Sequence, residues 1–520
     1  MAGQHVIYRQ ILDITFTSRE EALSGQEAIS NIYHNDLLPL INEIFDGVLG
    51  DDEVIRIDSI TLDLGTIAQN SLKEELIARL RKQLIDKLKK EVQTAGILAE
   101  DSMPLMKWLQ ENLPEGSTRT ERVSELELLA YFLQTGILPW WARKSKMGTN
   151  ERLVNELVRK QPDALKSILE ALVQHSLILR RLTYQLPDSS LQLLVTLWYP
   201  YWRNILPGVL ADIQSTVKSG ELPVRAEIEV REWCWEVVFK HVTKHYFTPD
   251  FPEVPAQPDS SVTQLVFRFI EDAATPGKHK ELVMAMQEKR NWVYPQFPKI
   301  LLQLEKFYSK RKEGVVENAA SKKKAKKAKE VKVEVSSDTI LPRKPFPVYA
   351  TPGTEEDIMI HNAGMVILWP FLETLFTGLS LMENKEFVSA SATHRAALLL
   401  NYLVTKETVV PEYELILCKV LCGFPTEEPL PAAITLSPEE EEECENLLNV
   451  VAVRWTALKG TSGEAMRQTF LQKDGLLKQQ ENGWYLRIER ATVDILVDKL
   501  PWGISIIRLP WTEKILYVEW

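Results

Sequence analysis

Cysteine is scarce in this chain, whose 520 residues include four: Cys234, Cys418, Cys422 and Cys444. So few thiols cannot form a disulfide framework in a protein of this length, which excludes the class of disulfide-rich secreted domains and favours a reducing compartment. The N-terminus, MAGQHVIYRQ, also lacks the basic region and apolar stretch of a signal peptide. We therefore expect a cytoplasmic protein.

Long apolar runs are absent as well. No window of about 18 uninterrupted apolar residues occurs, so the sequence predicts no membrane-spanning helix. The formal net charge is -11 and the isoelectric point is about 5.5. Because an acidic protein repels the phosphate backbone, we expect no nucleic-acid partner for the whole molecule and no membrane partner.

Signatures of catalysis and cofactor binding are missing too. The chain has no phosphate-binding loop, no GxGxxG after a strand and no GxSxG elbow. His241 and His245 have helical spacing, but Val242 stands where a zincin would have glutamate. Cys418 and Cys422 lack a second pair at metal-ligand spacing and are interpreted as core residues. We expect no enzyme activity, no cofactor and no bound metal.

Apolar residues, in contrast, make up 45% of the chain, which is enough for several cores. Helical periodicity dominates, and 28 prolines keep the individual helices short. The sequence predicts a predominantly α-helical α+β protein with small β-containing modules at both termini. We expect a strand-helix-strand-helix module at 1–100, a helical domain at 101–308, a disordered Lys-rich linker at 309–346, a second helical domain at 347–480 and a Trp-rich β module at 481–520.

The N-terminal module shows both periodicities. Leu12, Ile14 and Phe16 alternate with polar residues, which predicts a strand, and a helical pattern follows from about residue 19 to 49. The stretch EVIRIDSITLDLG alternates in two phases, which predicts a second strand with a bulge or tight turn near Asp58.

A long amphipathic helix is then predicted at about 71–92. One face of it carries the stripe Leu72, Leu76, Leu80, Leu84 and Leu88. Two interpretations are open: the stripe packs inside its own domain, or it mediates helical self-association.

The predicted linker is strongly basic at its start. Between Ser309 and Lys332 there are ten Lys or Arg residues, three Glu residues and almost no large apolar side chains, a composition typical of disorder. Three interpretations are open: a solubilising tether, a basic tether that touches an acidic surface, and a nuclear-import or nucleic-acid-binding segment.

The C-terminal region combines a capped helix with strands. In LSPEEEEECENLL, Ser437 is the expected N-cap and Glu440 the third residue of a capping box, which explains the glutamate run without a metal. Trp484, Leu486 and Ile488 alternate as in a strand. The closing residues predict a short helix at 491–500 and further strands at 504–508 and 515–520.

Six segments resemble one protein family. They are HVIYRQILDITF, IRIDSITLDLG, YFLQTGILPWW, HNAGMVILWPFLETLF, ELILCKVLCGF and the closing LPWGISIIRLPWTEKILYVEW. The most specific are the NAG-x-V-x-L-x-P-F stretch and the doubled LPW with a terminal VEW. Together they resemble the tape measure proteins of contractile injection systems, which are relatives of phage tails, over nearly the whole chain outside the linker.

The resemblance implies a non-enzymatic assembly protein of a particle with sheath, inner tube, baseplate and spike. Such a protein would be made in the cytoplasm, start at the baseplate hub, occupy the lumen while the tube polymerises, and set the tube length. The implied partners are the baseplate hub or spike and the inner tube proteins. Self-association and retention in the mature particle are left open.

The predicted conformation of the chain argues against a simple ruler role. A single helix of 520 residues would span about 780 Å, but the prolines and the sheet-like ends exclude that conformation throughout. The alternative is a globular assembly chaperone or baseplate-associated docking protein. Its candidate docking residues are large aromatics, each of which could equally be an ordinary core residue: Trp369, Phe371, Trp502, Trp511 and Trp520.

Overall fold

The chain forms two compact units in the computed structural model. Unit 1 comprises residues 1–128, 139–143 and 344–347, and unit 2 comprises residues 129–138, 144–343 and 348–520. The residues that the structure describes are 7, 10–16, 18–48, 60–68, 71–98, 108, 120–139, 142, 150–222, 230–243, 258–274, 278–287, 291–321, 357–458 and 460–520.

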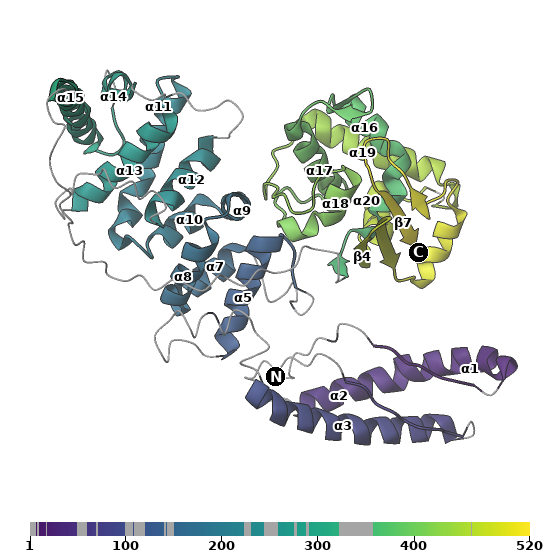
Figure 1. The fold of residues 1–520 in the computed structure, drawn as a ribbon. Helices are drawn as coiled ribbons and strands as arrows, with labels where there is room; N and C mark the ends of the chain where they lie inside the picture. Colours follow the sequence, from purple (N-terminus) through teal and green to yellow (C-terminus); the bar gives the residue numbers. More distant parts are fainter. Residues whose placement is uncertain are drawn as a thin grey trace. The chain divides into compact units, whose positions relative to one another are not determined.

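Unit 1 is built around two long helical stretches. The first consists of α1 (Arg19–Ile32), the π-helical turn η1 (Tyr33–Leu37) and α2 (Leu38–Val48), and the second is α3 (Leu72–Leu98). Helix α2 runs alongside α3 (Figure 1). Four of the five stripe leucines of α3 pack inside their own unit, as the first of the two interpretations expects, in a cluster made of Leu37, Leu40, Ile44, Leu76, Leu80, Leu84 and Leu88.

The strands predicted in this unit are not found in its described residues. Residues 10–16 and 60–68 carry no strand. Ile60, Leu62 and Leu64 instead pack against the cluster between α2 and α3, so the alternation serves packing on helices. A strand also needs a neighbouring backbone to bond with, which alternation alone does not supply. The expected strand residues at 55 and 57 and the bulge near 58 lie outside the described residues.

Unit 2 begins with a helical half, residues 129–321. It opens with the end of α5 (Thr120–Thr135), which stops at Gly136 as predicted; this residue has φ +77°, a conformation that glycine adopts without strain. The helices that follow are α7 (Asn150–Lys160), α8 (Pro162–Leu172), α9 (Ser176–Gln185), α10 (Asp188–Val195), η3 (Pro200–Asn204), α11 (Leu206–Lys218), α12 (Val230–Val242), α13 (Pro258–Ala273), α14 (His279–Gln287) and α15 (Phe297–Ser321).

The prolines shorten these helices in the way the sequence predicts. Helices α8, η3 and α11 each have proline in their first two positions, where its missing N–H costs nothing. None of the described helices combines the length and the apolar character that crossing a bilayer requires.

Helix α15 continues past residue 309, where the sequence predicts the linker to begin. Lysine, glutamate and alanine are good helix formers, so a stretch without large apolar residues can extend a helix that packing has already started. The remainder of the predicted linker, residues 322–346, lies outside the described residues.

The carboxyl-terminal half of unit 2, residues 357–520, contains a five-stranded sheet of order β1-β4-β5-β7-β6. Its neighbours are antiparallel except for β5 and β7, which are parallel. The predicted strands near 484–488, 504–508 and 515–520 form, and the last of them lies inside the sheet. The strands are β1 (Ile358–Ile360), β4 (Gly475–Gln480), β5 (Gly483–Ile488), β6 (Ile506–Ile507) and β7 (Ile515–Glu519).

The sheet also takes β1 and β4 from residues that the sequence assigns to the second helical domain. Strand β1 has three residues, and GLLKQQ of β4 does not alternate in polarity, so neither carries a period-two signal. A separate two-stranded hairpin is formed by β2 (Met382–Glu383) and β3 (Glu386–Phe387). The short helix predicted at 491–500 forms as the 3-10 helix η8 (Thr492–Lys499).

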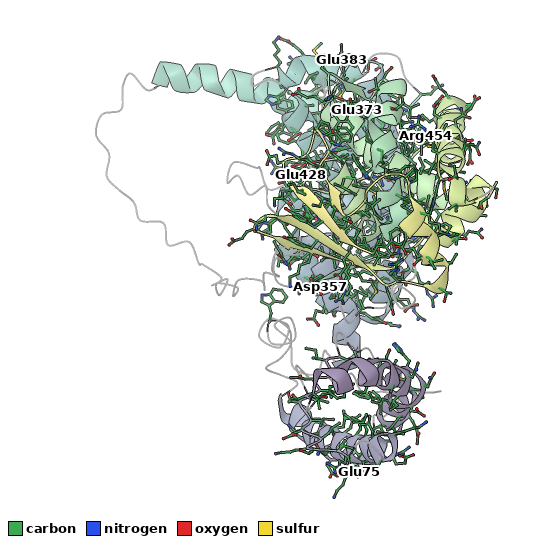
Figure 2. The ribbon with its side chains drawn as sticks, turned by 90° about the vertical axis from the view of Figure 1, so that its right-hand side faces the viewer. Glu75, Asp357, Glu373, Glu383, Glu428 and Arg454 are labelled. Carbon is green, nitrogen blue, oxygen red and sulfur yellow. The ribbon has the colours of Figure 1, made fainter. Side chains whose placement is uncertain are left out.

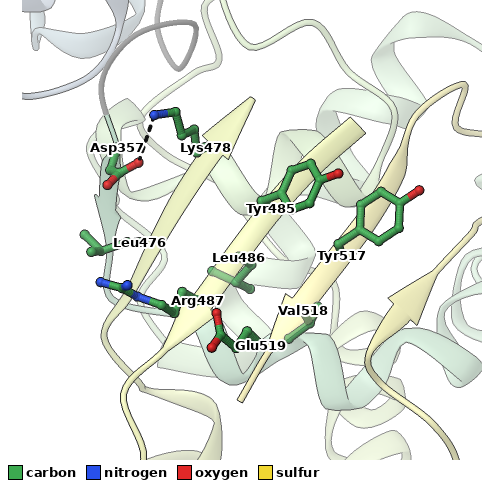
Figure 3. Close-up of a pocket in the computed structure, with 9 residues that line it drawn as sticks. All are labelled: Asp357, Leu476, Lys478, Tyr485, Leu486, Arg487, Tyr517, Val518 and Glu519. Atoms are coloured by element: carbon green, nitrogen blue, oxygen red, sulfur yellow. Dashed lines mark ion pairs between the residues drawn. The ribbon is translucent and has the colours of Figure 1, made fainter. Parts of the chain in front are cut away.

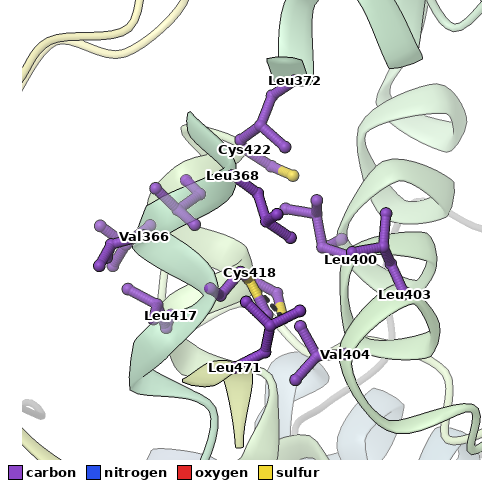
Figure 4. Close-up of a cluster of buried hydrophobic side chains, with 14 of the residues drawn as sticks. Val366, Leu368, Leu372, Leu400, Leu403, Val404, Leu417, Cys418, Cys422 and Leu471 are labelled. Atoms are coloured by element: carbon purple, nitrogen blue, oxygen red, sulfur yellow. Dashed lines mark hydrogen bonds between the residues drawn. The ribbon is translucent and has the colours of Figure 1, made fainter. Parts of the chain in front are cut away.

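Helices pack on the inner face of the sheet, and the main core lies between them; Figure 4 shows part of this core. The stretch after β1, predicted as a buried helix, is the 3-10 helix η4 (Ala363–Phe371) followed by α16 (Leu372–Gly378). Its burial is as expected, but Pro370 lies inside it. The other helices are α17 (Ala390–Thr405), η5 (Glu412–Glu414), α18 (Ile416–Leu421), α19 (Pro438–Arg454), η6 (Thr456–Leu458), α20 (Gly463–Met466) and η7 (Arg467–Leu471).

The capping box predicted for α19 is present. The Glu440 N–H donates to Ser437 Oγ at 3.2 Å, and the Ser437 N–H donates to Glu440 Oε2 at 2.8 Å. Glu440 also forms an ion pair with Arg395 of α17. The glutamate run is therefore accounted for by the start of a helix.

Candidate docking surface of the carboxyl-terminal half

Three of the five aromatic candidates come together beside η4. The Trp369 indole N–H donates to Gly503 O at 2.9 Å, and the Trp502 indole N–H donates to Ile367 O at 3.0 Å. The Phe371 and Trp502 rings meet edge to face at 5.2 Å. These reciprocal bonds hold η4 against the turn that follows η8.

Trp511 lies at a different place, near the end of α18. Its indole N–H donates to Leu421 O at 2.9 Å, and its ring contacts Phe376 at 6.0 Å and Phe387 at 6.2 Å between centroids. This tryptophan therefore connects the chain before β7 to α16, α18 and the hairpin.

Trp520 is anchored through a buried carboxylate. Its indole N–H donates to Asp494 Oδ2 at 3.1 Å, and the same carboxylate forms an ion pair with Lys473 at 2.9 Å. Burial alone would raise the pKa of Asp494, but hydrogen bonds from the Ala491 N–H, Lys473 and Trp520 outweigh it and hold that pKa below its ordinary value. The terminal residue is thus fixed by η8.

All four indole N–H groups are satisfied within the chain, and each tryptophan is partly buried against the main core. Phe371 is buried outright. The structure therefore gives each candidate a packing role and leaves partly exposed edges on the four tryptophans. It does not gather the five into one patch.

A broader surface lies on the opposite side of the sheet from the core, and we call it the outer sheet face. Its side chains form two rows across the strands. The first row is Ile506, Tyr517, Tyr485, Lys478 and Asp357, and the second is Glu519, Arg487, Leu476 and Met359. The alternate residues of the same strands, such as Leu477, Leu486 and Leu516, belong to the core.

Two tyrosines form the centre of the outer sheet face (Figure 3). The Tyr485 and Tyr517 rings stack at 4.8 Å between centroids with planes 19° apart. A shallow pocket of about 250 Å³ lies along these strands. Met359 and Ile506, at the two edges of the sheet, are 63% and 62% exposed, so helices cover only the inner face.

Charged side chains on this face occur as neighbouring opposite pairs. Asp357, labelled in Figure 2, and Lys478 form an ion pair at 3.8 Å. Arg487 and Glu519 lie opposite each other on the parallel strands β5 and β7. The face therefore presents tyrosine, methionine and arginine, which are enriched at protein interfaces, among charges that balance one another.

Sequence reasoning missed the outer sheet face. The alternation in β5 identifies Tyr485 and Arg487 as one face of a strand, and β7 places Tyr517 likewise. That these two strands are parallel neighbours in this register is not encoded in either pattern. The pairing, rather than the strands, creates the surface.

The described histidine and cysteine residues that the sequence offered as metal ligands are engaged in packing instead. His245 is outside the described residues, and the partly buried His241 ring stacks on Trp202 at 5.8 Å between centroids. Cys418 and Cys422 are core residues (Figure 4), and burial raises the pKa of both thiols. Among the residues that the structure describes, no three His, Cys, Asp or Glu side chains lie close enough together to hold a metal ion.

The sequence was compared with known families and proteins. Residues 4–520 match the family model described as contractile injection system tape measure protein. The chain belongs to the contractile injection system tape measure protein family. Comparisons with curated proteins and with solved structures gave no match. Membership of the tape measure family implies association with other components of such a particle.

The structure shows what the most specific stretch of this tape measure protein does locally. The Asn362 side chain is buried and donates to Glu414 O at 2.9 Å, and the Ala363 N–H donates to Lys473 O at 2.9 Å. A Cβ on Gly364 would lie 1.7 Å from Phe470 O. Gly364 therefore allows close backbone packing between η4 and η7, while Asn362 and Ala363 join the start of η4 to η5 and to the turn after η7.

Proposed function

We propose that this tape measure protein acts in particle assembly as a non-enzymatic, folded docking component. It assembles in the cytoplasm and binds the baseplate or spike hub and the inner tube proteins. The outer sheet face is the proposed contact. Tyr485, Tyr517, Arg487 and Met359 are residue types enriched at interfaces, and Ile506 adds a further exposed apolar side chain.

The rigid strands beneath the outer sheet face support its choice as the docking surface. The inner sides of β4, β5 and β7 are packed into the main core, so side chains on the outer side are already held in position. Binding then loses little conformational entropy, which favours affinity. The partly exposed edges of Trp369, Trp502, Trp511 and Trp520, with Phe371 behind them, are proposed as secondary contacts.

The tyrosine pair provides the test. We expect Tyr485→Ala with Tyr517→Ala to reduce binding to purified hub and tube proteins at least tenfold and to lower particle yield in electron micrographs, with thermal unfolding changed little. Val453→Ala removes a 78%-exposed apolar side chain from α19 and serves as the control. Normal binding and yield in the double variant would refute docking through the outer sheet face.

A ruler role is the second candidate, and the family match over residues 4–520 favours it. The lengths of the described helices do not favour a ruler, because α3, at 27 residues, spans only about 40 Å. A helical insertion of about 36 residues between Lys327 and Ala328 separates the two. A ruler that is extended in the tube, with the two halves of unit 2 apart, lengthens the tube by about 54 Å, whereas a folded docking component leaves the tube-length distribution unchanged.

A further inference from the structure

The helical half and the carboxyl-terminal half of unit 2 meet at three charged side chains. They are Arg181 of α9, Glu412 of η5 and Lys419 of α18, and all three are fully buried. Arg181 Nε donates to Glu412 Oε2 at 2.9 Å, and Lys419 Nζ donates to Glu412 Oε1 at 2.6 Å. One carboxylate therefore joins a cation from each half.

Backbone carbonyls from both halves accept the remaining donors. Arg181 Nη1 donates to Leu133 O at 2.6 Å and Gln134 O at 3.0 Å, both at the end of α5, and Nη2 donates to Glu427 O. Lys419 Nζ donates to the carbonyls of residues 426 and 428 at 3.0 and 2.7 Å. The excess positive charge thus lies among oriented carbonyl dipoles, the condition under which a buried ion pair is tolerated.

The halves also fit closely around this cluster. A Cβ on Gly136 would lie 2.7 Å from Glu412 Oε1 and 3.1 Å from the Arg181 guanidinium. The Gln185 side chain bonds across the junction in both directions, accepting from the Glu412 N–H at 2.9 Å and donating to Leu430 O at 2.8 Å. These contacts fix how the two halves are aligned with each other.

If the halves separated, the charged side chains and the carbonyls that accept from them would lose their partners. Leaving such buried groups unpaired has a high free-energy cost. We propose that Arg181, Glu412 and Lys419 form a clasp that holds the two halves as one body without help from the peptide connection between them. Residues 322–356 then do not set the spacing of the halves, and they could add length to an extended ruler only after the clasp opens. This proposal does not depend on the docking role of the outer sheet face.

Cutting the connection in the full-length protein tests the clasp. A site for a sequence-specific protease is placed between Lys327 and Ala328 and cleaved after purification. We expect the nicked protein to elute from a sizing column as one species at micromolar concentration and to separate only in denaturant. Elution as two fragments under native conditions would overturn the proposal.

Substitutions then identify the contact responsible. Nicked Glu412→Gln and Arg181→Met proteins should associate at least tenfold more weakly than the nicked natural sequence. Arg152→Met, which alters an exposed pair with Glu156 on α7, should not. Association of all three nicked variants at full strength would contradict the clasp.

Hydrogen exchange in the uncut Glu412→Gln protein separates clasp opening from general misfolding. The N–H groups of Glu412 and Ala432 bond across the junction, to Gln185 and to Tyr184 O, whereas the Ala363 N–H bonds within its own half. The first two should lose at least tenfold in protection while that of Ala363 stays. Loss at all three together, or at none, would oppose the proposal.

Discussion

At the scale of single residues, the backbone packing at position 364 leaves room only for glycine. Because the Cβ of any other residue would overlap the carbonyl oxygen of Phe470, we expect Gly364→Ala to force η4 and η7 apart and to cost about 3 kcal/mol of unfolding free energy. Gly378 at the end of α16 has no atom within 4 Å of its Cβ position, so Gly378→Ala is the matched control, with a change under about 1 kcal/mol. Urea unfolding of both variants measures the difference, and equal midpoints would contradict the packing described.

His241 predicts a pH dependence of stability. Burial, helped by the positive charge of Arg268, lowers the pKa of this imidazole from 6.5 to about 4. Below pH 6.5 the unfolded chain takes up a proton that the folded chain refuses until about pH 4. Stability is therefore lost as the pH falls through this window, by up to about 1.4 kcal/mol per pH unit.

The measurement is the unfolding free energy of the natural sequence and of His241→Gln at several pH values between 4 and 7. Gln cannot titrate, so the variant should show a flatter curve over that range whatever its absolute stability. Parallel curves would show that His241 titrates normally in the folded protein.

At the scale of elements, the stripe of α3 decides the stability of unit 1. Leu84 is buried in the cluster between α2 and α3, whereas Lys87 on the same helix is exposed. We expect Leu84→Ala to cost about 2–4 kcal/mol and Lys87→Ala to stay within about 0.5 kcal/mol. Hydrogen exchange of the α3 amides reports the difference. A changed oligomeric state with unchanged protection would instead favour the self-association interpretation.

Elements with a strong local signal were predictable, and those defined by a neighbour were not. The α19 capping box, the stop at Gly136 and the last strand follow from residue types at fixed spacing. Strands β1 and β4 exist because other strands offer hydrogen bonds to them, and residues 60–64 alternate without forming a strand. Helix η4 is a 3-10 helix that contains Pro370 and lies with Gly364 against the backbone of η7, features that its apolar pattern does not specify.

At the scale of the whole molecule, six of the 61 Lys and Arg residues of this acidic chain, all of them lysines, lie together between 322 and 329. A stretch with no large apolar side chain buries little surface, so we expect replacement of these lysines by serine to leave thermal unfolding unchanged. A fall in particle yield that high salt reproduces in the natural protein would support the basic tether. Unchanged yield would support the solubilising tether, and a changed melting temperature would contradict the expectation.

The aromatic candidates illustrate the division between sequence and structure. Their large aromatic side chains make Trp369, Phe371, Trp502, Trp511 and Trp520 candidate docking residues before any fold is known. Only the structure shows that each indole N–H finds an acceptor inside the chain and that the tyrosines of β5 and β7 form a wider exposed surface. Sequence position carries no information about which acceptor lies nearby.

The sequence by itself determined the predominance of helix, the helix end at Gly136, the capped and stripe-bearing helices, three strands near the C-terminus and the family. These depend on interactions between residues a few positions apart, where spacing sets geometry. The tertiary structure alone decided the five-strand order, the outer sheet face and the junction of Arg181 with Glu412 and Lys419. Those features join residues far apart in the chain, and their burial and pairing exist only once the cores have formed.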